Sequence, residues 1–75
     1  MPYDRNADLP RQVRDALPDD AQTIYRSAFN HAWDQYADEE DRKGDASREE
    51  TAHRVAWSAV KQSYTKEGDR WVKKN

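Results

Sequence analysis

Acidic residues gather in one short stretch, Asp38 to Glu50, which reads DEEDRKGDASREE and holds seven acids and three bases. If Gly44 is placed at the sixth position of a helix–loop–helix calcium loop, Glu39 falls at the first position and Glu50 at the twelfth. Oxygen ligands at this spacing surround a hard cation. Lys43 falls at the fifth position, where an oxygen ligand is required, and its ammonium group repels a cation. Two interpretations therefore stay open: a loose divalent-cation site, or a solvated connector between two helices.

The two ends of this stretch suit different roles. Under the cation interpretation, the metal ligands are the acids at its front, namely Asp38, Glu39, Glu40, Asp41 and Asp45. Because the ligand ring is incomplete, we expect weak and poorly selective binding of Ca²⁺ or Mg²⁺, with no tightly bound cofactor. At the other end, Ser47 and Glu50 have the spacing of a capping box, which predicts the start of a helix.

The last third of the chain has the opposite charge, with six bases and two acids in residues 51–75. Bases interleaved with aromatic residues can follow a phosphate backbone and stack on unpaired nucleobases. A candidate surface for a partner or for nucleic acid therefore consists of Trp57, Arg70, Lys73 and Lys74. The same bases also fit a solvated helix face and tail, and Trp57 also fits a core position that meets another helix.

Catalytic chemistry finds little support in the sequence. The two histidines, His31 and His53, are 22 residues apart on different predicted helices, beside rather than within the apolar stripes. Nucleophile, phosphate-loop and zinc-protease motifs are all missing, and the chain has no cysteine. We therefore expect a protein that is not an enzyme, in a reducing cytoplasm. No apolar run approaches the roughly 20 residues of a membrane span, so we expect a soluble protein.

Helical periodicity must position these residues, and it predicts helices over about 8–17, 20–37 and 47–66, with a charged loop at 38–46. Asp8 is the expected cap of the first helix, and Asp19 or Asp20 that of the second. The middle helix has the clearest apolar stripe, formed by Ala21, Ile24, Tyr25, Ala28, Phe29, Ala32, Trp33 and Tyr36. Short strands are possible near residues 2–4 and 70–73.

The size and composition predict one domain that spans residues 1–75. Charged residues make up 37% of the chain and hydrophobic residues 35%, so the core must be small. Three tryptophans, four tyrosines and one phenylalanine can supply the buried area, because each aromatic ring removes a large surface from water.

Several segments resemble the ChaB family, whose members are named as cation transport regulators. The segments are MPY, DLP, ALPDDAQTIYRSAFNHAWDQY, DASREETAHRVAWSAVKQSY and RWVKK, which together cover nearly the whole chain. The resemblance implies a mainly α fold, with three helices in an arrangement similar to the cyclin box and a small two-stranded sheet formed by the termini. Tyr3 and the Trp71-Val72 pair would then form the two strands.

The resemblance also implies a function. It suggests a small cytoplasmic regulatory protein that contacts the cytoplasmic face of a calcium/sodium–proton antiporter and so lies at the inner membrane through that partner. We expect the chain to be a monomer. Related domains occur in proteins thought to bind DNA, which keeps nucleic-acid binding as the alternative. A third reading is a protein-interaction domain without metal dependence.

Overall fold

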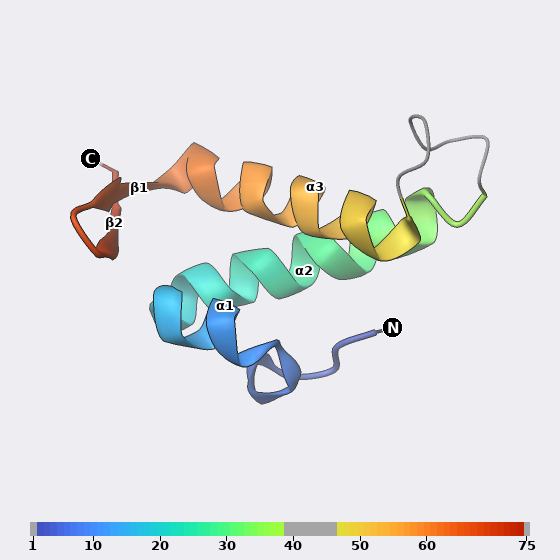
Figure 1. Ribbon diagram of the computed structural model, residues 1–75, viewed down its shortest axis with the longest axis horizontal. Helices are drawn as coiled ribbons and strands as arrows, with labels where there is room; N and C mark the ends of the chain where they lie inside the picture. Colours follow the sequence, from blue (N-terminus) through green and yellow to red (C-terminus); the bar gives the residue numbers. More distant parts are fainter. Residues whose placement is uncertain (1, 39–46, 75) are drawn as a thin grey trace.

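The computed structural model describes residues 2–38 and 47–74, and it consists of helices and one small sheet (Figure 1). In chain order the elements are the 3₁₀ helix η1 (Asn6–Asp8), α1 (Arg11–Ala16), α2 (Asp19–Gln35), α3 (Arg48–Ser63), β1 (Tyr64–Glu67) and β2 (Arg70–Lys73). The expected fold class, mainly helical with three α-helices and a two-stranded antiparallel sheet, is confirmed. None of the helices in the described ranges is both long and apolar enough to cross a membrane.

The two long helices, α2 and α3, lie side by side and run in opposite directions (Figure 1). Their contact follows from apolar residues at helical spacing on each of them. On α3 the buried residues are small, since Ala52, Ala56 and Val60 are all 0% exposed. Small side chains let the backbones approach closely, and the aromatic rings of Tyr25 and Phe29 from α2 fill the remaining space.

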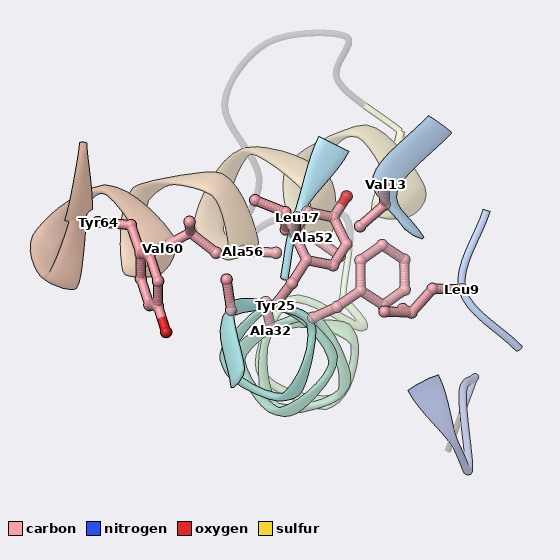
Figure 2. Close-up of a cluster of buried hydrophobic side chains, with 11 residues drawn as sticks. Leu9, Val13, Leu17, Tyr25, Ala32, Ala52, Ala56, Val60 and Tyr64 are labelled. Atoms are coloured by element: carbon pink, nitrogen blue, oxygen red, sulfur yellow. The ribbon is translucent and has the colours of Figure 1, made fainter. Parts of the chain in front are cut away.

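One hydrophobic core joins α1, α2 and α3. Figure 2 shows side chains of α2 and α3 packed together with those of the N-terminal segment and α1. The buried residues of this core are Leu9, Val13, Leu17, Ala21, Tyr25, Phe29, Ala32, Ala52, Ala56, Val60 and Tyr64. Tyr25 and Phe29 are the largest of the fully buried residues. Burying one such side chain contributes roughly 1.5–3 kcal/mol, so these two rings carry much of the stability of a small domain.

The first helix begins later than the sequence predicts. Leu9 has an extended backbone (φ −65°, ψ 153°), because a residue that precedes proline is disfavoured in the helical region. Pro10 is therefore the N-cap of α1, and Asp8 is not its cap. The Asp8 carboxylate lies instead 3.3 Å from the guanidinium of Arg5.

The second helix also starts without the predicted side-chain cap. Pro18 is its N-cap residue, and Asp19 and Asp20 both lie inside the first turn. Carboxylates in that turn still stabilise the helix, because they face the positive end of its dipole.

The sheet is a hairpin at the C-terminal end, so the expected pairing of the two termini is wrong. Val72 pairs with Thr65 and Trp71 with Lys66, and no strand forms at residues 2–4. The helix expected to reach residue 66 accordingly ends at Ser63. Gly68 and the following residue form the two-residue turn, and Gly68 has φ +61°, a backbone conformation that glycine adopts without strain.

Tyr3 is held by a side chain of α2 rather than by a strand. The Tyr3 N–H donates to Oδ1 of Asn30 (3.2 Å), and Nδ2 of Asn30 donates to the Tyr3 carbonyl (2.7 Å). Asn30 is only 6% exposed. This amide therefore supplies the two hydrogen bonds that a neighbouring strand would have supplied, and it fixes the N-terminal segment on α2.

Candidate functional site

Acidic side chains lie where α3 begins. Ser47 caps this helix as predicted, because its Oγ accepts a hydrogen bond from the Glu50 N–H at 3.0 Å. The Glu50 carboxylate, which a complete capping box would turn back to the cap residue, lies instead 3.6 Å from the Arg54 guanidinium. Glu49 and Glu50 are both exposed, so this helix start presents negative charge to the solvent.

Arg48 fastens the start of α3 to the end of α2. Its Nε donates to the Trp33 carbonyl at 2.7 Å, and its guanidinium carbon lies 4.2 Å from the centroid of the Trp33 ring. The last carbonyls of a helix have no partner within that helix, so Arg48 satisfies one of them. Sequence periodicity gave no signal for this contact, which fixes the two helix ends that flank the acidic stretch.

The acids predicted to bind a cation fall mostly outside the described part of the chain. Asp38 is described and is exposed just beyond α2. Glu39, Glu40, Asp41 and Asp45 lie outside the described residues. Within residues 2–38 and 47–74, no three acids or histidines come close enough together to hold a metal ion. The cation site therefore stays a prediction from sequence.

The two histidines lie in different surroundings. His53 packs against the core, and the centroid of its ring lies 4.7 Å from that of Phe29 in an edge-to-face arrangement. Its Nδ1 is hydrogen-bonded to the Tyr25 hydroxyl, and its side chain is 29% exposed. His31 is exposed and lines a groove with Ile24 and Val55. The described structure thus brings no second histidine to either one.

Burial changes the chemistry of the tyrosines beside His53. It raises the pKa of Tyr25 well above its ordinary value of 10.0, and nearby Tyr3 and Glu49 raise it further. Burial and Glu49 also raise the pKa of Tyr3. Both phenols consequently keep their protons at neutral pH and are available as hydrogen-bond donors.

The basic residues lie at the hairpin end of the molecule. Arg70, Lys73 and Lys74 are exposed there. The aromatic rings are less available, because Trp57 contacts Trp71 at 5.6 Å between centroids and meets Tyr25 edge-on at 5.3 Å. Trp57 therefore packs on the core, which was one of its two interpretations, while nucleic-acid binding stays a prediction based on the exposed bases.

An apolar groove lies between the outer faces of α2 and α3. Ile24 and Ala28 belong to the predicted apolar stripe of the middle helix, but they are only half-buried. They line this groove together with the half-buried Val55 and Ala59 of α3. Two packed helices bury only their facing stripes, so residues at the edge of each stripe stay open to the solvent.

The molecule measures 36 × 23 × 19 Å along its principal axes. Positive and negative charge are concentrated at opposite ends of the longest axis. The hairpin with its exposed bases lies at one end, and the end of α2 and the start of α3 lie at the other (Figure 1). Opposite charges at opposite ends give a dipolar protein, which orients toward a charged partner as it approaches.

These features define a small helical domain with a C-terminal hairpin and charged surfaces suited to binding. The ChaB family model matches residues 9–74, and the chain belongs to the ChaB family. A protein of Escherichia coli K12 named "Putative cation transport regulator ChaB" is 60% identical over 76 aligned positions, with both chains fully covered. A Shigella flexneri protein of the same name gives the same values.

A solved structure supports the same conclusion about the fold. The chain is similar to the "NMR solution structure of the putative cation transport regulator ChaB", with a TM-score of 0.82 and 60% sequence identity. The similarity covers 99% of this chain and all of the other. At this identity and coverage, the fold and the family agree.

Proposed function

We propose that this protein regulates cation transport by binding a membrane cation–proton antiporter at its cytoplasmic face, and that its acidic stretch binds Ca²⁺ or Mg²⁺ weakly. The observation that carries the proposal is the 60% identity, over the full length of both chains, to a protein named "Putative cation transport regulator ChaB". The name of this relative suggests regulation of cation transport, and the charged surfaces of this chain could bind a cation or a charged partner.

The acidic end supports the cation part of the proposal. Residues 38–50 carry a net charge of −4 in the sequence, and the described acids Asp38, Glu49 and Glu50 are all exposed. Exposed carboxylates keep most of their hydration, so they attract a divalent ion without binding it tightly. Arg48 holds the flanking helix ends together, which keeps the carboxylates concentrated in one region.

A cation titration followed by ¹H–¹⁵N NMR tests this part. With Ca²⁺ or Mg²⁺ added up to several millimolar, we expect amide signals of residues 38–50 to move progressively, with a dissociation constant on the order of 1 mM. The triple variant Glu39→Gln, Glu40→Gln, Asp41→Asn should abolish these shifts. Unchanged signals of residues 38–50 in the unmodified protein would refute cation binding.

A control variant at the other end of the molecule and one gain-of-function variant complete the titration. Glu67→Gln with Asp69→Asn removes acids at the hairpin end, and it should leave the cation-induced shifts of residues 38–50 intact. Lys43→Asn introduces an oxygen ligand at the fifth loop position and should tighten Ca²⁺ binding more than Mg²⁺ binding. Equal affinity for both ions after this change would mean that the carboxylates attract cations only as a diffuse charge.

A further inference from the structure

Strand β2 has one edge that no other strand in the described residues covers. The sheet has the order β1-β2, so β2 pairs with β1 along one side alone. Arg70 and Lys73 of this strand are exposed, and Trp71 and Val72 are half-buried. An uncovered strand edge offers backbone N–H and C=O groups to a further strand, which can come from a partner protein.

The pairing register shows which residues of β2 are bonded to β1. Glu67 and Arg70 flank the two-residue turn, so they exchange both hydrogen bonds of their pair. Hydrogen-bonded pairs then recur at every second residue, and the Lys74 N–H accordingly donates to the Ser63 carbonyl at 2.9 Å. Every second residue of β2, beginning with Arg70, therefore directs its N–H and C=O to β1.

Trp71 and Lys73 are the residues in between, and they direct their N–H and C=O groups to the free edge. Among the described residues, no backbone hydrogen bond outside the ladder uses these groups. The edge thus offers two donors and two acceptors in the alternating pattern that an added β-strand uses.

A groove of about 470 Å³ runs along this edge. Arg70, Trp71 and Val72 line one side of it, and residues 15–18 at the corner between α1 and α2 line the other. Successive side chains of a strand point to opposite faces, so a groove that contacts three in a row follows the edge of the strand. Its volume lies within the range of ligand sites, so a few residues of an extended chain have room there.

The charges at this edge favour an acidic partner. Residues 64–74 carry four bases and two acids. Arg70 and Lys73 are exposed, and no acid in the described residues lies within ion-pair distance of either one. The acid on the opposite wall of the groove, Asp15, is paired with Arg11 at 3.5 Å. A strand that carries acids would therefore meet unpaired positive charge.

Two other partners suit this edge less well. A second copy of the chain, paired edge to edge through β2, would bring Arg70 and Lys73 against the same bases, and like charges on adjacent strands are destabilising. Lysines protect edge strands from self-association in this way. Nucleic acid needs free aromatic faces for stacking, but the Trp71 ring packs against that of Trp57, 5.6 Å away between centroids.

We propose that the free edge of β2 binds an extended acidic peptide of a partner protein, which adds an antiparallel third strand to the sheet. Acids of this peptide oppose Arg70 and Lys73, and apolar residues oppose Trp71 and Val72, because directly opposite side chains interact. The recognised sequence is then acidic–apolar–apolar–acidic. This inference stands apart from the proposed function, because it involves the hairpin and neither the acidic stretch nor a transporter.

Amide hydrogen exchange with a peptide probe tests the added strand. The probe is a short peptide with blocked ends and the central sequence Glu-Val-Ile-Glu. With the peptide at about ten times its dissociation constant, exchange of the Trp71 and Lys73 amides should slow about tenfold. In the free protein these two amides should exchange faster than those of Arg70 and Val72, which donate to β1. Unchanged exchange at Trp71 and Lys73 with the peptide in excess would overturn the proposal.

N-methylated peptides separate strand pairing from attraction between charges. In the antiparallel arrangement the isoleucine amide faces Trp71, and the valine amide points away from β2. Methylation of the isoleucine nitrogen should weaken binding about tenfold, through the loss of a hydrogen bond, whereas methylation of the valine nitrogen should weaken it less than about twofold. Equal binding of the two methylated peptides and the unmodified one would contradict the added strand.

Matched charge variants of the protein test the preference for acids. Arg70→Gln with Lys73→Gln should weaken peptide binding about tenfold, roughly the combined contribution of two exposed ion pairs. Arg54→Gln with Lys61→Gln removes the same charge from exposed positions of α3 and should weaken binding less than about twofold. Equal weakening by the two variants would contradict recognition at the edge. Single-stranded DNA that slows exchange at Trp71 and Lys73, where the peptide does not, would also overturn the proposal.

Discussion

Replacing Phe29 by alanine is expected to lower the free energy of unfolding by about 3–5 kcal/mol, the usual range for an aromatic ring removed from a core. Phe29 is 1% exposed, and its ring lies 4.8 Å from that of Tyr3 and 6.0 Å from that of Trp33 between centroids. The alanines that α3 buries in the core, Ala52 and Ala56, are too short to fill the cavity. Because a small domain has little stability to lose, most Phe29→Ala molecules should be unfolded at room temperature.

Urea denaturation monitored by circular dichroism and tryptophan fluorescence measures this loss. Gln35→Ala, at the exposed end of the same helix, is the control and should change the unfolding free energy by no more than about 0.5 kcal/mol. Phe29→Leu should fall between the two, since leucine fills part of the cavity. A cooperative transition of Phe29→Ala at the urea midpoint of the unmodified protein would contradict the described core.

Replacing Gln22 by methionine is expected to lower the free energy of unfolding by about 1–3 kcal/mol, although methionine is similar in size and more apolar. Gln22 is 8% exposed, and its Nε2 donates to the carbonyls of Leu17 (2.8 Å) and Arg14 (3.2 Å). These carbonyls end α1 and have no partners within that helix. Methionine has no donor, so a buried carbonyl would lose its partner.

The matched control for this change is Gln62→Met, at an exposed position of α3. It should leave the unfolding free energy within about 0.5 kcal/mol of that of the unmodified protein. Amide hydrogen exchange should show faster exchange in α1 for Gln22→Met, because the corner between α1 and α2 is loosened. Equal stability of the two glutamine variants would show that the Gln22 hydrogen bonds contribute nothing.

The helical part of the fold could be predicted because its apolar spacing is regular. The stripe through Tyr25 and Phe29 identified both α2 and its buried face. The helix predicted over residues 47–66 was extended too far, because Tyr64 lies four residues after Val60 and fits a helix as well as a strand. The decisive signal was Gly68 with Asp69, a pair typical of a two-residue hairpin turn between short strands.

Contacts made by single polar side chains could not be predicted. Asn30 is hydrogen-bonded to Tyr3, which lies 27 residues away in the sequence. Gln22 is hydrogen-bonded to the end of α1, up to 8 residues away. Such pairs depend on how the segments are placed relative to one another, and apolar periodicity does not contain that information. The hydrogen bond between His53 and Tyr25, 28 residues apart, depends in the same way on the register between α2 and α3.

In the candidate site, too, local spacing could be predicted from the sequence and tertiary contacts could not. Ser47 was predicted as a helix cap from local spacing, and it is one. Trp57 had two interpretations, which only its contacts with Tyr25 and Trp71 could separate. The acids at residues 39–41 and 45 remain a prediction from composition, so cation binding depends on the titration described above.

Cation-driven proton release in everted membrane vesicles is the most direct test of the proposed regulatory function. Vesicles from cells that lack this protein are energised by respiration, Na⁺ or Ca²⁺ is added, and the collapse of the pH gradient is followed with a fluorescent amine. We expect the purified protein to change the rate about fivefold, the lower range of usual coupling between sites. The Glu67→Gln, Asp69→Asn control should act like the unmodified protein, whereas an identical rate with and without the protein would contradict the proposed regulation of cation transport.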